Sequence, residues 1–70
     1  MQYLIVIEKT ATGFSAYSPD LDGCVATGAT KDEVERSMHD AIEFHLEGMR
    51  EEGYSVPVPS AYSTYVDVSI

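Results

Sequence analysis

Cysteine and basic side chains are scarce in this 70-residue sequence, tryptophan is absent, and no apolar run is long. The single cysteine, Cys24, excludes an internal disulfide framework and is too little for a cysteine-rich zinc site. The longest apolar run, Tyr3 to Ile7, is ended by Glu8. It is far too short for a membrane span, and no basic segment precedes it as in a signal peptide. These absences predict a cytoplasmic chain in a reducing compartment.

Basic residues number only 4 against 12 acidic ones, so the formal net charge is -8. Phosphate backbones repel such a surface, which argues against direct nucleic-acid binding. An acidic surface instead attracts basic partners and speeds their encounter. The alternative is that the charge only keeps the protein soluble.

The length allows one domain, residues 1–70, and a hydrophobic content of 44% is enough for one compact core. Runs rich in β-branched residues, separated by turn-forming residues, predict three strands before a helix and one after it. The turns are Thr10–Gly13, where Gly13 is free to take positive φ, and Pro19–Gly23. The four strands are expected at residues 2–9, 14–18, 24–28 and 62–70.

The helix has clear boundary signals. Thr30 followed by Glu33 fits a capping box, and Gly53 is a natural residue to follow the last turn. Pro57 and Pro59 make the next stretch an extended linker. The residues expected on the apolar face, at helical spacing, are Val34, Met38, Ala41, Ile42, His45 and Met49.

The element order β-β-β-α-β predicts an α+β fold in which one helix packs on a four-stranded sheet. Three strands would form an antiparallel meander, and a right-handed crossover through the helix would bring the last strand parallel to the first, at the sheet edge.

Several segments, in this order and spacing, resemble the HicB family of antitoxins. They are Pro19 to Cys24, Ala26 to Gly28 with Thr30, Asp40 to Glu47, and Gly53 with Pro57 and Pro59. The resemblance implies a partial ribonuclease-H-like fold with strand order 3-2-1-4. It also implies a partner, a small basic HicA-type toxin that cleaves messenger RNA and that the antitoxin neutralises by covering its active surface.

Two features depart from the family pattern. Asp22 stands where family members often have proline, which makes the loop more acidic and less rigid. Longer members continue into a DNA-binding segment, whereas this sequence stops at Ile70. Operator binding is therefore not implied here. The alternative to a toxin-neutralising module is a stand-alone, oligomeric binding domain of the same fold without a toxin partner.

Catalytic and metal-binding patterns are weak. His39 and His45 lie on different sides of the helix, so they cannot share one metal ion. We expect His45 to be a hydrogen-bonded, partly buried structural residue and Cys24 to be a small core residue. The expected strands carry only Glu8 and Asp67 as carboxylates, too few for a metal-dependent nuclease. The sequence predicts a protein that is not an enzyme and has no cofactor.

Like charges recur on the polar side of the helix, where Glu43, Glu47 and Glu51 are spaced i, i+4. Such pairs are mildly destabilising, which favours a contact surface for a basic partner over a helix built only for stability. The alternative is an ordinary solvated face. The candidate partner-binding residues are Asp20, Asp22, Asp40, Glu43, Glu47 and Glu51.

Both sides of the first strand are apolar, but a single helix can cover only one face of the sheet. The uncovered face predicts a homodimer or larger assembly joined through the sheet. Alternatively, this face binds the toxin and the chain is monomeric. The candidate interface residues are Leu4, Val6, Tyr17 and Tyr65. The sequence leaves open whether a toxin exists, how many copies assemble and which surface a partner uses.

Overall fold

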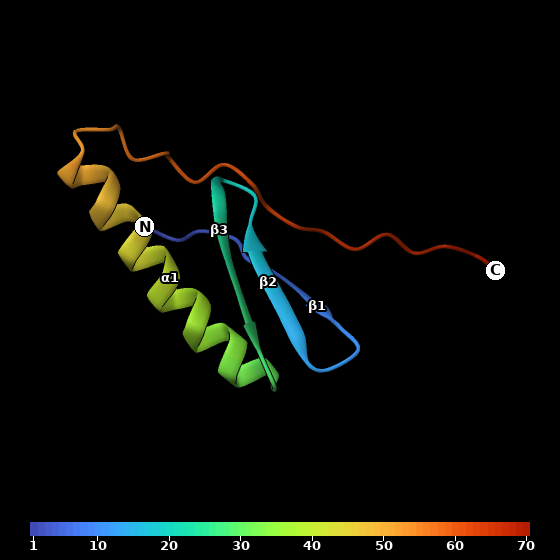
Figure 1. Ribbon diagram of the computed structural model, residues 1–70. Helices are drawn as coiled ribbons and strands as arrows, with labels where there is room; N and C mark the ends of the chain where they lie inside the picture. Colours follow the sequence, from blue (N-terminus) through green and yellow to red (C-terminus); the bar gives the residue numbers. More distant parts are fainter.

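The computed structural model describes residues 1–70 as a three-stranded antiparallel sheet with one helix against it (Figure 1). The strands are β1 (Val6–Lys9), β2 (Phe14–Ser18) and β3 (Leu21–Gly28), and the helix is α1 (Lys31–Glu51). The α+β class and the order of these four elements are as predicted. The bounds of β2 agree with the prediction, whereas β1 is shorter and β3 is longer than expected.

The β1–β2 hairpin closes through the predicted turn, where the Thr10 backbone N–H donates to the Gly13 carbonyl at 2.8 Å. Gly13 does not take the positive φ that we expected. It is needed for space instead, because a Cβ atom there would lie 2.4 Å from the Gly28 carbonyl oxygen.

The β2–β3 turn is tighter than the sequence suggested. Pro19 and Asp20 alone form it, since Ser18 already pairs with Leu21. The register then shifts, and Tyr17 pairs with Val25. Three residues of β3 are accommodated in this bulge, and Gly23 takes a φ of 76° within it. The predicted start of this strand at Cys24 was therefore wrong by the length of the bulge.

β1 begins at Val6 rather than at Gln2 because its neighbouring strand, β2, ends at Ser18. Val6 pairs with Tyr17, so in this register only Ile5 would still face β2, opposite its last residue Ser18, and the residues before Ile5 lie beyond the end of β2. Pro19 has no N–H to extend the ladder. The Ser18 hydroxyl instead donates to the Leu4 carbonyl at 2.9 Å, which satisfies a buried polar side chain and holds the entering chain in place.

The helix begins and ends as its boundary residues predict. The Glu33 N–H donates to the Thr30 side-chain oxygen at 3.1 Å. At the other end, Gly53 takes a φ of 78° and its N–H donates to the Arg50 carbonyl, while the Tyr54 N–H donates to the Met49 carbonyl. These two bonds form a Schellman motif, which satisfies carbonyls that the helix leaves free.

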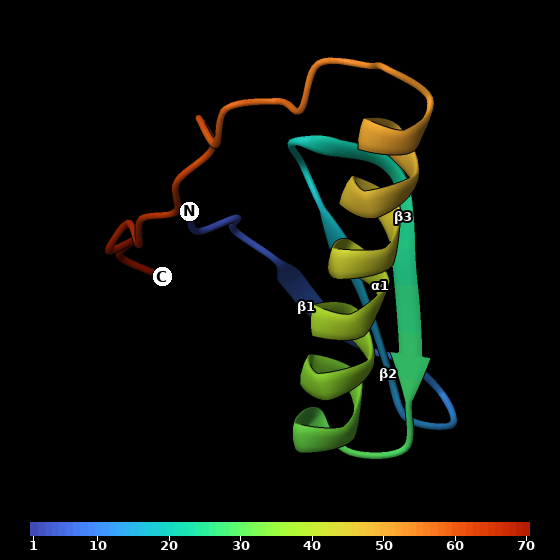
Figure 2. The ribbon, with the colours of Figure 1, turned by 90° about the vertical axis from the view of Figure 1, so that its left-hand side faces the viewer.

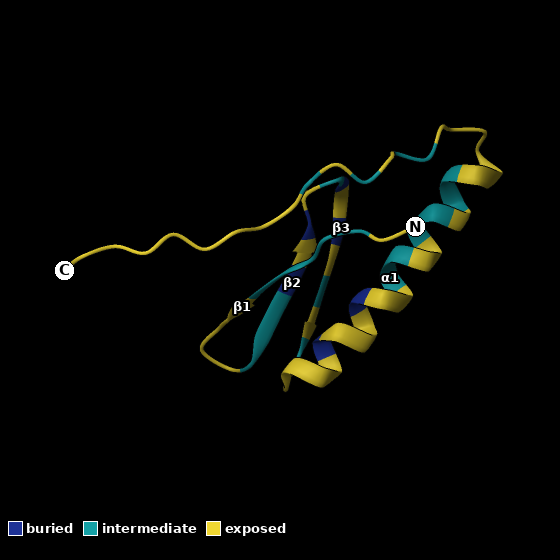
Figure 3. Ribbon diagram, turned by 180° about the vertical axis from the view of Figure 1, so that it is seen from behind, coloured by how far each residue is buried: buried dark blue, intermediate teal, exposed yellow.

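The core lies in a single layer between α1 and the sheet (Figures 2 and 3). The helix packs mainly over β3 and to a lesser extent over β2. Val34 and Met38 of the predicted apolar face are fully buried, and Leu46 joins this face although we had not assigned it there. The buried residues are Ala16, Ser18, Leu21, Cys24, Val34 and Met38.

The linker after the helix is fixed at two points. The Tyr3 hydroxyl donates to the Pro57 carbonyl. The Asp20 carboxylate accepts from the Ser60 N–H at 3.1 Å, the Ser60 hydroxyl at 3.0 Å and the Ala61 N–H at 3.2 Å. These contacts lead the chain across the end of the β2–β3 hairpin.

The predicted fourth strand does not form in the single chain. Every residue from Tyr62 to Ile70 is exposed, and the segment runs away from the sheet without pairing (Figure 1). The sheet order is β1-β2-β3, so the expected position beside β1 is empty. The alternating pattern alone could not position a strand whose linker is tied to Asp20 and directed outward.

Candidate protein-binding surface

An acidic stripe lies along the outer side of α1. Asp40, Glu43, Glu47 and Glu51 are all exposed. At about 100° per residue they fall within roughly 80° of arc, so they form one continuous stripe. Arg36 and Arg50 flank it on the same helix, but carboxylates outnumber them. The structure therefore brings together four of the six candidate partner-binding residues.

The two remaining candidates come from the β2–β3 hairpin and differ from each other. Asp22 is exposed, and no hydrogen bond or ion pair engages its side chain. The Asp20 carboxylate accepts from the backbone N–H groups of Ala61 and Ser60 and from the Ser60 hydroxyl, and these hydrogen bonds lower the pKa of the Asp20 carboxyl. The sequence offered Asp20 as a contact for a partner, but its carboxylate already fastens the linker of its own chain.

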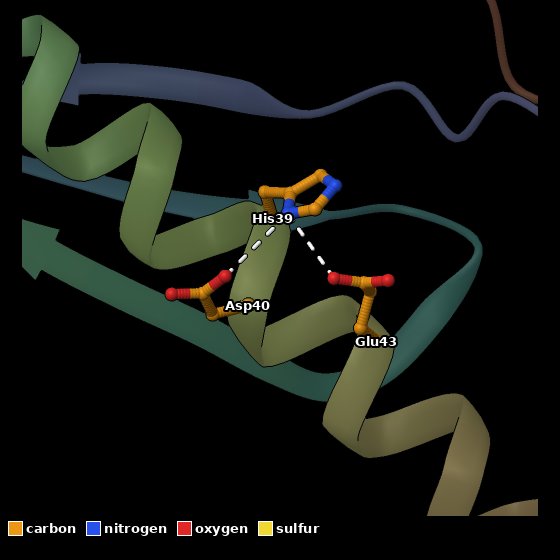
Figure 4. A group of neighbouring side chains, drawn as sticks. All are labelled: His39, Asp40 and Glu43. Carbon is orange, nitrogen blue, oxygen red and sulfur yellow. Dashed lines mark hydrogen bonds and ion pairs between the residues drawn. The ribbon is translucent and has the colours of Figure 1, made fainter.

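A histidine lies within the acidic stripe (Figure 4). The Nδ1 atom of His39 is 3.5 Å from an Asp40 carboxylate oxygen and 3.3 Å from one of Glu43. Their potential ligand atoms lie within 4.8 Å of one another, and all three residues are exposed. Sequence reasoning compared His39 only with His45 and missed these carboxylates.

An exposed aromatic side chain borders the stripe. Phe44 of α1 is 79% exposed. It lines a shallow pocket of about 420 Å³ between the helix and β3, with Ala41, His45 and Gly48 of the helix. An aromatic side chain left in solvent among carboxylates is typical of an anchor for a partner protein. Phe44 was missed because we assigned the helix faces by their apolar and charged stripes alone.

Cys24 and His45, which we expected to have structural roles, are both at least partly buried. Cys24 is a free thiol in the core, and burial raises its pKa, which keeps the thiol protonated and unreactive. His45 is half-buried as predicted, and its expected hydrogen bond stays a prediction. Its ring lines the pocket beside Phe44.

The sheet face opposite α1 carries an apolar row. Val6, Tyr17 and Val25 are cross-strand partners, so their side chains share one face. This row includes two of the four candidate interface residues and adds Val25. Leu4 precedes β1 and is half-buried, whereas Tyr65 lies in the exposed C-terminal segment, away from this face.

The fold is that of a small α+β domain with one helix against a three-stranded sheet. Its charged residues gather on a solvated helix, and its apolar patches lie on the surface rather than in a closed cavity. The one helix of this chain lacks the long apolar stretch that a bilayer crossing requires.

Comparison with known proteins places the chain in a family. A sequence model for the HicB-like antitoxins of bacterial toxin–antitoxin systems matches residues 3–69, so the chain belongs to the HicB-like antitoxin family. This confirms the resemblance drawn from the sequence. Among solved structures, the HicA3 and HicB3 toxin–antitoxin complex contains a similar chain, with a TM-score of 0.73 and 37% identity, covering 84% of this chain and 70% of that one.

Two relatives are similar in sequence. An uncharacterized 14.9 kDa protein from the rep-hol intergenic region of Haemophilus phage HP1 is 36% identical over 67 residues, which are 96% of this chain and 50% of that protein. A UPF0150 protein of Helicobacter pylori is 44% identical over 41 residues, 59% of this chain and 57% of that protein. The chain thus spans about half the length of these relatives.

Proposed function

We propose that this chain is an antitoxin module that binds a small, basic, HicA-type RNA-cleaving toxin and neutralises it by protein–protein contact. The observation that carries the proposal is the acidic stripe of α1, with exposed Phe44 beside it, on a chain of the HicB-like antitoxin family. Its structural relative comes from a toxin–antitoxin complex.

Charge and shape both suit such a partner. A net charge of -8 speeds the approach of a basic protein, and the carboxylates of the stripe can pair with its lysine and arginine side chains. Phe44 supplies the apolar contact that gives an interface most of its affinity. The pocket between α1 and β3 can receive an apolar side chain of the toxin next to these charges.

The module needs no catalytic group for this role, and we propose that it is not an enzyme. Glu8 lies at the solvent-exposed end of β1 and Asp67 in the exposed C-terminal segment, with no further carboxylate grouped about either. The ribonuclease-H-like strand order also belongs to the proposal. The observed sheet supplies the order 3-2-1, and a fourth strand beside β1 would complete it.

Toxin binding can be tested by mixing the purified chain with a HicA-type toxin encoded beside it and measuring affinity by calorimetry and RNA cleavage by gel. We expect a complex in which cleavage stops. Glu43→Lys/Glu47→Lys should weaken binding at least tenfold and restore cleavage, because the reversed charges repel a basic surface.

The matched control is Glu8→Lys/Glu35→Lys, which makes the same change in net charge at exposed positions outside the stripe. We expect this variant to bind with nearly the affinity of the unaltered chain. Loss of binding in the control but not in the stripe variant would place the toxin on another surface and overturn the assignment.

A second candidate function is a stand-alone oligomeric binding domain. The apolar row of Val6, Tyr17 and Val25 favours it, because an exposed patch of this kind usually marks an interface. If no small basic reading frame accompanies this one and Val6→Asp dissociates an oligomer without unfolding it, this second function is supported and the first is not.

A further inference from the structure

The outer edge of β1 has no partner. β1 pairs with β2 on one side only, and it is the first strand of the sheet order. An exposed edge presents free N–H and C=O groups that can pair with an extended chain. The adjoining residues Tyr3 and Ile5 are half-buried, so this edge borders apolar surface.

A groove follows the same edge on the helix side. It has a volume of about 400 Å³ and is lined mainly by apolar residues of the entering chain and of α1. It exists because the helix packs over β3 and β2 and leaves the flank of β1 uncovered. Its principal apolar residues are Met1, Tyr3, Ile5, Ile42 and Leu46.

The C-terminal segment Tyr62–Ile70 has the sequence pattern of the strand that is missing at this edge. Its residues alternate, with Val66, Val68 and Ile70 on one side, as in a strand with one buried face. All three are more than 70% exposed in the single chain. Such a segment pairs with no neighbour and buries none of its apolar side chains.

We propose that Tyr62–Ile70 of one copy adds as a fourth strand to the β1 edge of a second copy, and that the exchange is reciprocal. The backbone of the segment would pair with Val6–Lys9, and its valine side chains would fill the groove beside Ile5 and Ile42. A symmetric exchange pairs the β1 edge of both copies, and it closes at two copies because each copy gives one segment and receives one.

The path of the linker favours a second copy over the segment's own sheet. Asp20 holds Ser60 and Ala61 at the end of the β2–β3 hairpin. Tyr62 and Ser63 still lie beside Gln2 to Leu4. From there the chain diverges from β1 and extends outward, which gives the molecule a long dimension of 49 Å against 27 and 17 Å (Figure 1). The segment thus reaches away from its own β1, toward the position of another molecule.

Sedimentation of the 70-residue chain at high-micromolar concentration tests the exchange. We expect a dimer of twice 7.7 kDa for the unaltered protein. Val66→Asp/Val68→Asp should give a monomer with unchanged helical circular dichroism, because no residue of the folded body depends on these side chains. Val58→Asp is the matched control, since Val58 is 80% exposed but lies in the linker before Asp20's contacts; it should remain dimeric.

A mixed sample of isotopically labelled and unlabelled chains then identifies the paired strands. We expect contacts between β1 amide protons of one copy and the C-terminal segment of the other. A monomeric unaltered chain, a dimer that survives Val66→Asp/Val68→Asp, or contacts found only within one copy would each overturn the proposal. Dissociation by Tyr17→Asp but not by the valine variant would place the dimer on the sheet face instead.

Discussion

Asp20 is the residue that decides where the C-terminal part of the chain begins its path. Its carboxylate accepts three hydrogen bonds from two consecutive linker residues, Ser60 and Ala61. These contacts join positions that lie 40 and 41 residues apart in the sequence. A single side chain in a two-residue turn therefore fixes the direction in which the segment leaves the folded body.

Acid should release this attachment. Hydrogen bonding lowers the pKa of Asp20 in the folded chain, so its contribution is fully present above the ordinary carboxyl pKa and is lost as the pH falls through the lowered value. NMR from neutral to acidic pH should show the Ser60 and Ala61 amide protons losing their protection from exchange in that range. Asp20→Ala should show the released state at every pH, whereas Asp22→Ala, with no such bonds, should behave as the unaltered chain. Unchanged protection in Asp20→Ala would contradict this role.

Met38 and Phe44 illustrate opposite uses of apolar side chains on one helix. Met38 is fully buried against the sheet, so Met38→Ala should lower the free energy of unfolding by about 2–5 kcal/mol, enough to unfold a marginal domain. Phe44 is exposed, and Phe44→Ala should change stability by no more than about 0.5 kcal/mol. Urea denaturation measures both, and calorimetry with the toxin should show weaker binding for Phe44→Ala. A large loss of stability in Phe44→Ala would show that it is a packing residue.

At the scale of the elements, the sequence predicted what depends on local chemistry. Thr30 and Gly53 bounded the helix because capping involves only neighbouring residues. The bounds of β2 were also predicted. Strand ends that depend on a neighbour were not: β1 is short because β2 stops at Ser18, and β3 is long because a bulge around Gly23 absorbs the register shift.

In the candidate site, too, the features that depend on neighbouring residues were predicted, and those that depend on distant segments were not. Helical spacing predicted the acidic stripe of Asp40 to Glu51, since it depends only on the period of the helix. The engagement of Asp20 with Ser60 and the pocket beside Phe44 arise from distant segments meeting, which no local pattern reports. Alternation along a strand placed Val6 and Tyr17 on the same side of the sheet, and their pairing agrees with this. That this face is an interface stays a prediction.

Packing of α1 on β3 depends on close approach at one glycine. A Cβ atom at Gly28 would lie 2.7 Å from the Val34 backbone nitrogen, so Gly28→Ala must push the start of the helix away from the sheet. We expect a fall in melting temperature, by about 4–8 °C for each kcal/mol lost. Gly48→Ala is the control, because nothing lies within 4 Å of a Cβ there and alanine favours a helix by about 1 kcal/mol. Thermal denaturation should show opposite shifts, and a stabilised Gly28→Ala would refute the close-packing argument.

The whole molecule concentrates its charge on one solvated element and its apolar surface on two others. The acidic stripe lies on α1, whereas the apolar row lies on the opposite sheet face and the C-terminal segment extends to one side. The stripe and the groove beside β1 meet at Glu43, which belongs to the stripe and also lines the groove. A toxin at α1 and a second copy at the β1 edge would therefore lie next to each other along the helix.

Because the stripe is exposed, its attraction for a basic toxin should be sensitive to salt. Screening shortens the range of such interactions from about 10 Å at 0.1 M to about 3 Å at 1 M ionic strength. Stopped-flow measurements should therefore show an association rate that falls as salt rises, with little change in the dissociation rate, since steering acts before contact. Glu43→Lys/Glu47→Lys should flatten this dependence, while Phe44→Ala should leave the slope unchanged and speed dissociation. A slope that is flat for the unaltered chain would mean that the acidic stripe does not face the toxin during encounter.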